Sequence, residues 1–456
     1  MISGLKPYAQ MKTADVPGVD AVPSHWRVRK LRGVLSPVAE RNRPDLPLLS
    51  VVRERGVVLR DTENKEENHN FIPDDLSNYK VVRAGQFAMN KMKAWQGSYG
   101  VSRHDGIVSP AYFTFGLSGV EGNFFHLAIR SIAYVPFFTR ASDGVRVGQW
   151  DLSQSRMKEI PFLIPPSEEQ AAIVRFLDHA DRRIRRAIAT KQKLLRLLEE
   201  QRRAIIHRAV TRGLDPDVRL KPSGIEWLGD VPESWRIGRV KSELRNLNTR
   251  RIPLSSSKRG SMTQRTYDYY GASGVIDKVD DYLFDDDLIL IAEDGANLVL
   301  RNLPLAIIAR GRFWVNNHAH ILRPLKGSLE YFAALLECIN YLPWITGAAQ
   351  PKLTKDRLMA ISIPVPSEDE QNEIAAWIEA NTKNLRTSAQ RVKREIELLR
   401  EYRTRLVSDV VTGKIDVRKA AESMPEIIEC GDSECGEAEE YEDDSLENIT
   451  TEDQAE

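Results

Sequence analysis

The sequence predicts an α+β protein built as an internal repeat, with two globular domains joined by two long helices that pack antiparallel about a pseudo-twofold axis. Three observations lead to this fold class. VPSHWRVRKL at 22–31 returns as VPESWRIGRV at 231–240, residues 150–170 align with 351–371, and a long helical pattern follows each copy of the second motif. Self-similarity at this distance is typical of repeated structural units rather than of one compact domain.

Length and composition place the chain among ordinary globular proteins. Its 456 residues are enough for two or three domains, and its hydrophobic content of 42% is usual. Apolar runs stay below the roughly 18 residues of a membrane span, and the N-terminus lacks the apolar core of a signal peptide. We therefore expect a cytoplasmic protein. The three cysteines do not form the pattern of a disulfide scaffold.

The net charge of zero hides an uneven distribution. Residues 421–456 hold fifteen acidic and no basic side chains, so residues 1–420 carry 65 basic against 50 acidic side chains, a net charge of +15. A basic body attracts polyanions such as nucleic acid. We interpret the acidic tail as a disordered solubilising segment, and a polyanion mimic that shields a nucleic-acid surface is the alternative.

The repeat divides the chain into variable and constant blocks. We predict an N-terminal arm at 1–31, a first globular domain at 32–166, a first long helix at 167–213, a connector with the second Trp motif at 214–240, a second globular domain at 241–366, a second long helix at 367–413, and the acidic tail at 414–456. The two globular blocks do not align convincingly with each other. Short β-branched and aromatic runs, separated by Gly, Asn and Asp, predict strands in both.

Both long helices have recognisable ends. Ser167-Glu-Glu-Gln and Ser367-Glu-Asp-Glu follow prolines and have the form of capping boxes, whereas Gly213 and Gly413 are typical helix terminators. Each helix of about 45 residues would span roughly 65–70 Å at about 1.5 Å per residue.

Apolar residues in these helices recur at alternating spacings of four and three, which predicts a coiled-coil seam. The seam residues are Ile173, Leu177, Ala180, Ile184, Ala187, Leu194, Leu198 and Ile205 in the first helix, and Ile374, Ile378, Leu385, Val392, Leu399, Tyr402, Leu406 and Val410 in the second. Because neither helix can bury its stripe alone, we expect the two to pack antiparallel on each other. A parallel coil between two copies of the chain is the alternative.

Catalytic signatures are missing from the sequence. It has no GxxxxGK[ST] loop and no glycine-rich dinucleotide fingerprint, so we expect no cofactor in this chain. Asp287, Glu293 and Asp294 suggest a metal-dependent nuclease as an alternative, although strand-end carboxylates are the simpler interpretation. His318 and His320 would share one face of a strand and so raise a metal hypothesis. Hydrogen-bonding or core roles are the simpler interpretation here too, and we predict no catalytic residue and no metal site.

Both variable blocks are rich in side chains that contact nucleic acids. The candidates are Lys91, Lys93, Trp95, Gln96, Ser98, Arg103 and Arg146 in the first block, and Lys258, Arg259, Gln264, Arg265, Tyr267, Asn297, Arg301, Asn316, Asn317, His318 and Lys352 in or just after the second. Cations interleaved with amides and aromatic rings supply phosphate donors and base-edge groups close together. Each residue alone is typical of an ordinary protein surface. Because the residues concentrate in the two blocks that do not align, they indicate two domains that recognise different nucleic-acid sequences.

A set of short motifs carries a family resemblance. VPSHW, VPESW, NKMKAWQGSYGVS, DGIVSPAY, IAEDGAN, VNNHAH, AQPKLT, PPSEEQ and PSEDEQ together resemble the specificity subunit of type I restriction-modification systems, over nearly the whole chain before the acidic tail. The resemblance implies two target-recognition domains, each reading one half of a bipartite asymmetric DNA target, and a helix pair that sets the gap. The acidic tail departs from the usual pattern of that family.

The same resemblance implies what assembles on the chain. It would be a non-catalytic subunit that holds two methyltransferase (M) subunits and two restriction/translocase (R) subunits. Those partners would carry S-adenosylmethionine, ATP and Mg²⁺, which agrees with the motifs missing here. A structural coiled-coil adaptor with no DNA role is the other alternative.

Overall fold

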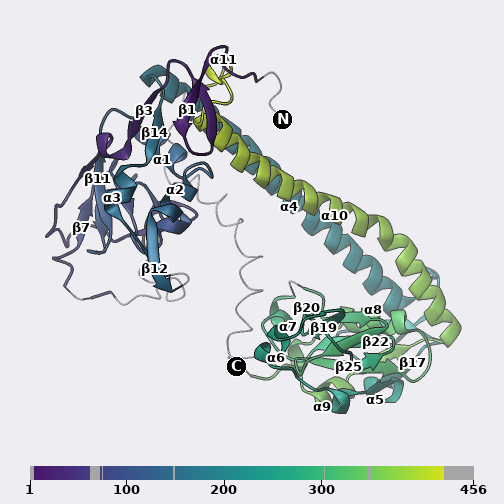
Figure 1. Ribbon diagram of the computed structural model, residues 1–456. Coiled ribbons are helices and arrows are strands. Elements are labelled where there is room, and N and C mark those ends of the chain that lie inside the picture. The colour runs from purple at the N-terminus through teal and green to yellow at the C-terminus, as the bar shows by residue number, and fades with distance from the viewer. Residues whose placement is uncertain are drawn as a thin grey trace. The chain divides into compact units, whose positions relative to one another are not determined.

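A computed structural model describes residues 5–61, 72–73, 75–146, 149–301, 303–347 and 351–425 (Figure 1). Most of the acidic tail, residues 426–456, therefore lies outside the described residues. The described chain divides into two compact units. The first unit comprises 5–190 and 395–425, and the second comprises 191–394. Each unit thus contains sequence from both copies of the repeat.

The first unit is built around a four-stranded antiparallel sheet. Its strand order is β4 (Leu35–Pro37), β11 (Phe113–Leu117), β8 (Phe87–Met89) and β9 (Tyr99–Val101). Helix α1 (Gly122–Ile129) contributes Phe124 and Phe125 to the same core, where the ring centroids of Phe125 and Phe87 lie 5.2 Å apart. The large aromatic content of these short runs therefore forms the core of this unit.

Two further strand pairs complete the first globular part. They are β5 (Leu49–Val52) with β6 (Gly56–Leu59), and β7 (Lys80–Val82) with β10 (Gly106–Val108). A parallel bridge between Leu48 and Ile107 joins the two pairs. The remaining elements are α2 (Val135–Arg140), β12 (Ser142–Arg146), β13 (Gln149–Leu152), α3 (Gln154–Lys158) and the 3₁₀ turns η1 (Leu31–Gly33) and η2 (Ala94–Gln96).

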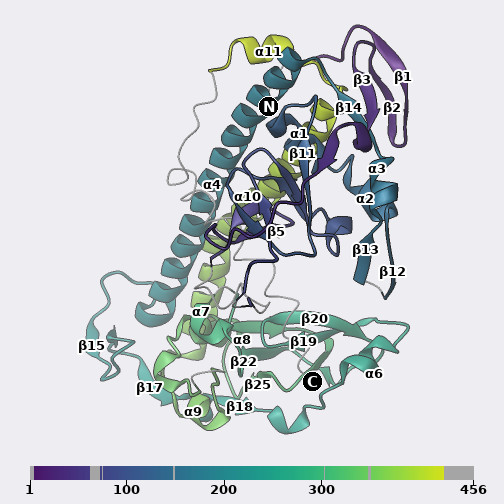
Figure 2. The ribbon, with the colours of Figure 1, turned by 90° about the vertical axis from the view of Figure 1, so that its left-hand side faces the viewer.

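The second unit repeats this topology although the two sequences do not align. One sheet has the order β18 (Leu244–Asn246), β25 (Ala319–Pro324), β22 (Leu288–Ala292) and β23 (Ala306–Ala309). The other has the order β20 (Gly274–Val279), β19 (Tyr267–Gly271), β24 (Arg312–Val315) and β21 (Phe284–Asp285), with β19 parallel to β24 (Figure 2). The parallel β19–β24 pair corresponds to the Leu48–Ile107 bridge, so both globular parts share one connectivity.

Smaller elements of the second unit connect these sheets. They are α5 (Val240–Glu243), η3 (Asn248–Arg250), α6 (Ser256–Gly260), α7 (Asn297–Leu300), α8 (Leu329–Cys338), η4 (Leu342–Trp344) and α9 (Lys355–Ala360). Helix α8 packs on the sheet at the position that α1 occupies in the first unit, because both follow the strand next to the edge of the sheet.

The duplicated Trp motif has the same setting in both units. In the first unit β1 (Met11–Val16) pairs with β2 (Val19–Pro23), and β3 (Arg27–Lys30) pairs with β14 (Pro161–Ile164). The second unit has β15 (Leu220–Pro222) with β16 (Asp230–Pro232), and β17 (Arg236–Arg239) with β26 (Ser362–Val365). Trp26 and Trp235, at equivalent places, are both fully buried.

The two long helices begin and end close to the predicted residues, but the predicted capping boxes are wrong, because the Gln170 side chain bonds the Glu121 N–H and Glu370 Oε1 accepts from the Trp235 indole. Helix α4 spans Ser167–Arg212 and α10 spans Glu368–Val411. Gly213 and Gly413, with φ of +74° and +77°, adopt the left-handed conformation that ends a helix and that glycine adopts at little cost.

Within each unit, the start of one long helix packs against the end of the other. In the first unit Ile173 and Leu177 of α4 share a core with Leu406 and Val410 of α10. In the second unit Ile206, Ala209 and Val210 of α4 share a core with Ile374 and Ile378 of α10. A salt bridge joins Arg403 Nε to Asp181 Oδ1 at 2.5 Å. At each of these two ends the helices have opposite chain directions, whereas an antiparallel pair along their whole length stays a prediction.

The predicted seam of α4 is wrong towards its C-terminal end. Leu194 is 44% exposed, and Ile205 is half-buried whereas its neighbour Ile206 is buried. A straight α-helix drifts by roughly 20° per heptad against a strict seven-residue repeat, so its apolar stripe moves around the helix. The residues that enter the second core are accordingly Ile206, Ala209 and Val210.

The described ends of the chain meet in the first unit. The backbone of Lys6 forms an antiparallel bridge with Asp416. Helix α11 (Arg418–Glu422) follows this bridge (Figure 2). The Arg418 guanidinium lies over the ring of Tyr8, 5.1 Å from its centroid. Among the residues that the structure describes, none of the helices has the length and apolar character required to cross a membrane.

Candidate nucleic-acid interface

The candidate residues of the first unit surround the turn η2, between β8 and β9. Lys93 and Arg103 are exposed, and Gln96 is half-buried. Lys91 Nζ lies 2.9 Å from Asp151 Oδ2, and the Trp95 ring lies 5.0 Å from that of Trp150 on β13. The structure therefore places Lys91 and Trp95 against the β12–β13 hairpin.

Ser98 and Arg146, the two other candidates of the first unit, are not among these surface side chains. Ser98 is 2% exposed, so it has little surface to offer a ligand. Arg146 has its backbone in β12, and its side chain lies outside the described residues. The remaining candidates of this unit stay predictions.

A half-buried histidine and a half-buried arginine, which the sequence analysis did not single out, pack beneath this surface. Arg130 donates hydrogen bonds to the carbonyls of Tyr99, Arg53 and Glu54, at 2.5, 2.7 and 2.8 Å. His126 Nδ1 accepts from the Val101 N–H at 3.1 Å. Burial, together with nearby guanidinium groups, lowers the pKa of His126 to about 3, so its imidazole is neutral. These groups fix the β5–β6 turn against β9.

In the second unit one predicted cation, Arg259, turns inward, whereas Lys258 and Arg265 are exposed. Arg259 is 7% exposed, donates to the Leu254 carbonyl at 2.5 Å, and pairs with Asp277 at 3.1 Å. Arg265 also bonds Asp277, which therefore receives two guanidinium groups. Lys258 and Gln264 are exposed on the same segment, and the half-buried Tyr267 ring lies 5.1 Å from that of Tyr282. Arg259 thus supports the segment, while its neighbours form its surface.

Asn297 and Arg301 stabilise the short helix α7. The Asn297 side chain exchanges two hydrogen bonds with the backbone of Leu303, at 2.9 and 3.1 Å. Arg301 adopts a φ of +53° and donates to the carbonyls of Ile339, at 3.0 Å, and Glu337. Both side chains therefore have intramolecular contacts that the sequence did not indicate.

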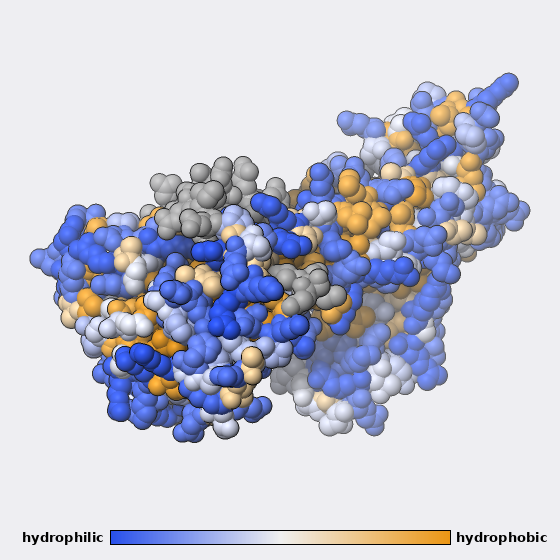
Figure 3. All heavy atoms as spheres, turned by 90° about the horizontal axis from the view of Figure 1, so that it is seen from above, coloured by the Kyte–Doolittle hydropathy of each residue, from blue (hydrophilic) through white to orange (hydrophobic). Residues whose placement is uncertain are grey.

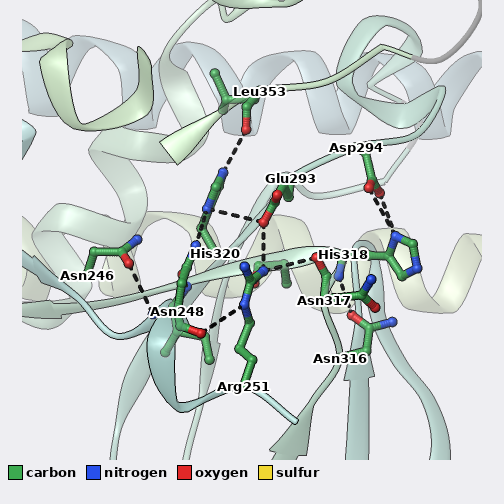
Figure 4. A network of polar contacts seen from close by, with 12 residues as sticks. Asn246, Asn248, Arg251, Glu293, Asp294, Asn316, Asn317, His318, His320 and Leu353 are labelled. Atoms are coloured by element: carbon green, nitrogen blue, oxygen red, sulfur yellow. Dashed lines mark hydrogen bonds and ion pairs between the residues drawn. The ribbon is translucent and has the colours of Figure 1, made fainter. Parts of the chain in front are cut away.

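The other candidates belong to a polar network between β22 and the turn before β25 (Figure 4). Arg251 Nη1 contacts Glu293 Oε2 at 2.6 Å and the carbonyls of Asn317 and Ala319 at 3.0 and 2.8 Å. Lys352 Nζ lies 3.4 Å from Glu293 Oε1. The half-buried Glu293 carboxylate thus contacts an arginine and a lysine next to the VNNHAH turn.

The two histidines of VNNHAH have separate roles. His320 is fully buried; its Nε2 lies 2.7 Å from the Leu353 carbonyl and its Nδ1 2.8 Å from Asn248 Nδ2. Burial is the main cause that lowers the pKa of His320, which favours the neutral ring. His318 precedes β25 and its Nδ1 lies 2.9 Å from Asp294 Oδ1 (Figure 4). The idea that both share a strand face is wrong, because only His320 lies in the strand.

The carboxylates of the nuclease alternative are all engaged. Asp287 pairs with Arg310 at 2.5 Å, Glu293 with Arg251, and Asp294 with His318. Across the described ranges, no group of three or more His, Cys, Asp or Glu side chains has the arrangement of a metal site. Asn316, which is 6% exposed, bonds the His318 backbone N–H at 2.8 Å, whereas Asn317 is exposed.

Arg251 and Asn248 are the residues of this network that the sequence analysis missed. Asn248 lies about seventy positions before His320, which it contacts, and Arg251 lies about as far before the Asn317 and Ala319 carbonyls that it bonds. An Asn and an Arg just after a short strand carry no specific signal. On the face drawn in Figure 3 hydrophilic side chains prevail and hydrophobic ones gather in several groups. Apolar atoms are normal on the surface of a folded protein, so these groups alone mark no site.

Comparison with known proteins gives the class to which this architecture belongs. The family model described as type I restriction modification DNA specificity domain matches residues 127–196 and 232–398. This match covers more than half of the chain and lies in both units. The chain therefore belongs to the type I restriction-modification DNA specificity family, whose members are DNA-recognition subunits.

Individual relatives agree with that assignment. A protein named as a type I restriction enzyme specificity subunit of Haemophilus influenzae is 36% identical over 138 residues, which is 30% of this chain and 34% of that protein. The match thus spans about a third of that relative. A protein named as the MjaX specificity subunit of Methanocaldococcus jannaschii is 20% identical over 88% of this chain and 96% of its own length.

The fold also matches a solved structure. A chain from a structure on complex assembly and conformational transition of the type I R-M system superimposes with a TM-score of 0.60 at 15% identity. The match covers 86% of this chain and 99% of that chain. At this identity the likeness concerns the fold alone.

Proposed function

We propose that this chain reads a bipartite, asymmetric DNA sequence, with one half-site for each globular part. The observation that carries the proposal is one strand topology used twice with unlike surfaces. The turn between β5 and β6 presents the charged residues Arg53, Glu54 and Arg55, whereas the exposed residues after the turn between β19 and β20 are Val275 and Ile276. Two readers of unlike sequences would keep the frame and differ in such places.

The charge of the body accounts for affinity, and individual side chains for selectivity. A net charge of +15 on residues 1–420 favours binding through counterion release, which is blind to sequence. Amide and guanidinium groups in the major groove add roughly 1–3 kcal/mol of discrimination for each good bidentate pair. Lys93, Arg103, Lys258, Gln264 and Asn317 are the exposed predicted residues best suited to such contacts.

The long helices are proposed to form an antiparallel pair that sets the gap between the half-sites. The opposite chain directions of the helix ends within each unit support this arrangement. Two readers that face one side of a duplex would have half-sites centred about one helical turn, roughly 34–36 Å, apart.

The chain is proposed to act as a non-catalytic scaffold. Two methyltransferase subunits and two restriction/translocase subunits would assemble on it and carry S-adenosylmethionine, ATP and Mg²⁺. Family membership supports assembly with other restriction-modification subunits, whereas this stoichiometry is our proposal. The engaged carboxylates Asp287, Glu293 and Asp294 give no support to a self-sufficient nuclease.

A domain exchange tests the proposal. We expect that replacing residues 32–150 with the equivalent block of another family member changes one half-site and leaves the other and the gap unchanged. Genome-wide mapping of methylated adenines, with and without the gene, reads out both halves. A change of both half-sites, or a continuous target, would contradict the proposal. Sequence-insensitive DNA binding would favour the coiled-coil adaptor.

A further inference from the structure

Two consecutive side chains join each globular part to the long helix that follows it. They are Glu169 and Gln170 on α4 and, 201 positions later, Glu370 and Gln371 on α10. Glu169, Gln170 and Gln371 are 4%, 3% and 3% exposed. Polar side chains that are buried so deeply nearly always have hydrogen-bond partners, and those partners show which parts of the fold these residues connect.

The two glutamines make the same pair of hydrogen bonds. Gln170 Oε1 accepts from the Glu121 N–H at 2.7 Å, and its Nε2 donates to the Pro165 carbonyl at 2.8 Å. Gln371 Oε1 accepts from the Ser328 N–H at 3.0 Å, and its Nε2 donates to the Pro366 carbonyl at 3.1 Å. Each amide thus ties the first turn of a long helix to the globular part.

The first of these bonds reaches equivalent places in the two units. Glu121 is the N-cap residue of α1, and Ser328 is the N-cap residue of α8. The approach at Ser328 is close, because a Cβ on the preceding Gly327, whose φ is +82°, would lie only 2.2 Å from Gln371 Oε1. The contact therefore depends on a glycine beside it as well as on the glutamine.

The glutamates attach the Trp motif to the same turn. Glu169 Oε1 accepts from Trp26 Nε1 at 2.8 Å, and Glu370 Oε1 accepts from Trp235 Nε1 at 2.8 Å. Each helix is therefore held from two sides, by the Trp motif through the glutamate and by the globular part through the glutamine. Such a two-sided attachment restricts the tilt of the helix relative to its own globular part.

A small tilt at this joint has a large effect at a distance. A helix of 46 residues is roughly 69 Å long, so a tilt of about 3° displaces its far end by about 3.5 Å, close to the rise of one base pair. Helix length alone would therefore not define a gap to a single base pair.

We propose that Gln170 and Gln371 are positioning residues for gap selection, which hold each recognition part at a fixed angle to its helix. This inference rests on the proposed reading of a split target. It assigns the two glutamines no contact with DNA. Their loss should relax the spacing between half-sites and leave the half-site sequences unchanged.

The test uses the full chain with Gln170→Ala, Gln371→Ala and both together. Gln201→Ala and Gln390→Ala are matched controls, because these glutamines are exposed on the same helices. Each protein, assembled with its methyltransferase partner, selects from duplexes in which the two half-sites are separated by gaps of different length. For the double variant we expect the preference for the wild-type gap over gaps one base pair shorter or longer to fall about tenfold, as for loss of a buried hydrogen bond. The controls should keep the wild-type preference.

Two results would overturn the inference. One is an unchanged gap preference in a variant whose thermal midpoint stays within a few degrees of the wild type. The other is loss of a half-site sequence, which would give the glutamines a role in the reading surface. If Ala variants fail to fold, Gln170→Met and Gln371→Met keep a neutral side chain of similar length and lose both hydrogen bonds, and the same criteria apply to them.

A second measurement separates this inference from the proposed function. Spin labels at Ala111 and Ala189, both exposed in the first unit, report the angle between globular part and α4 without DNA. The labels are placed in a chain whose three native cysteines are replaced by alanine. We expect Gln170→Ala to broaden the distance distribution and Gln201→Ala to leave it unchanged. Equal widths would overturn the positioning role, whereas a wild-type chain that selects no split target would contradict the proposed function alone.

Discussion

The two units differ most where each long helix ends. In the second unit the chain runs from α4 through Gly213 into residues 214–222 without a break. At the equivalent place in the first unit two separate segments meet, and Lys6 bridges Asp416 while Arg418 covers Tyr8. The end of the long helix and the strands of the Trp motif are thus joined by the continuous chain in the second unit, and by backbone and side-chain contacts in the first.

The contacts of Glu169 and Glu370 differ between the junction without a continuous chain and the junction with one. Glu370 accepts a hydrogen bond from the Trp235 indole. Glu169 accepts from the Trp26 indole and also from Tyr8 Oη, and its Oε2 lies 2.7 Å from His25 Nε2. Tyr8 aligns with Asp217 of the second unit, which lies in the continuous chain. The noncovalent junction therefore uses a larger set of contacts around the same carboxylate.

The largest expected effect comes from the two buried tryptophans. We expect Trp26→Ala and Trp235→Ala each to lower the free energy of unfolding by about 3–5 kcal/mol, because each removes a fully buried ring and a hydrogen bond to a glutamate. Hydrogen exchange should show lost protection in the unit that carries the substitution. Trp377 on α10 is 37% exposed, so the control Trp377→Ala should lower the free energy of unfolding far less. Equal loss of protection in both units would mean that they do not respond separately.

The two helix-ending glycines sharpen the comparison. A left-handed φ costs a non-glycine residue roughly 1–2 kcal/mol, so Gly213→Ala and Gly413→Ala should both destabilise the fold. A Cβ on Gly413 would also lie 2.3 Å from Pro23 Cδ, whereas on Gly213 it would lie 3.4 Å from the Trp235 ring. We therefore expect Gly413→Ala to cost about 1–3 kcal/mol more. Urea unfolding of the two variants measures the difference, and equal costs would show that the packing at Gly413 yields easily.

The half-buried His126 makes the first unit sensitive to acid. The pKa of His126 is about 3 in the folded unit, below its ordinary value of 6.5, so only the unfolded chain takes up a proton as the pH falls through 6.5. Stability is then lost by about 1.4 kcal/mol per pH unit, or roughly 2 kcal/mol at pH 5. Urea unfolding of the wild type and of His126→Gln at pH 7.5 and pH 5 tests this. A variant as acid-sensitive as the wild type would contradict the assignment.

The smallest expected effect concerns the long helices. Asp181 and Arg403 are 30% and 33% exposed, and their salt bridge should contribute less than about 1 kcal/mol. A double-mutant cycle with Asp181→Asn and Arg403→Gln measures the coupling, and added salt should reduce it. Glu401 and Arg405, an i,i+4 pair on α10 alone, give a matched comparison. A coupling above 2 kcal/mol would mean that the pair is far less hydrated than its exposure indicates.

Local signals predicted the helical part of the fold well. The proline before Ser167 marked the start of α4, and Gly213 and Gly413 marked the ends of both helices, because helix ends depend on a few adjacent residues. The capping box itself was wrong, because the Gln170 side chain bonds Glu121 and Pro165 instead. The common topology of the globular parts could not be predicted. Strand pairing across long loops needs only hydrophobic runs of the right length, and Phe87–Met89 and Leu288–Ala292 meet that need with different residues.

The interface was harder to predict from sequence than the fold. Arg259, Arg301, Asn297 and Ser98 have the side-chain types expected of a DNA-binding surface, yet they are buried or bonded within the chain. A guanidinium group that satisfies a backbone carbonyl looks the same in sequence as one that binds phosphate. Only the distant partner, such as Leu254 for Arg259, distinguishes the two.

The composition of the first core also constrains the order of events during synthesis. Ile173 and Leu177 leave the ribosome more than two hundred residues before Leu406 and Val410, which cover them. The apolar face of α4 therefore lacks its partners from α10 until the whole second unit has been synthesised. We expect the nascent chain to be most prone to aggregation in that interval, and the first unit to reach its final packing last although it is translated first.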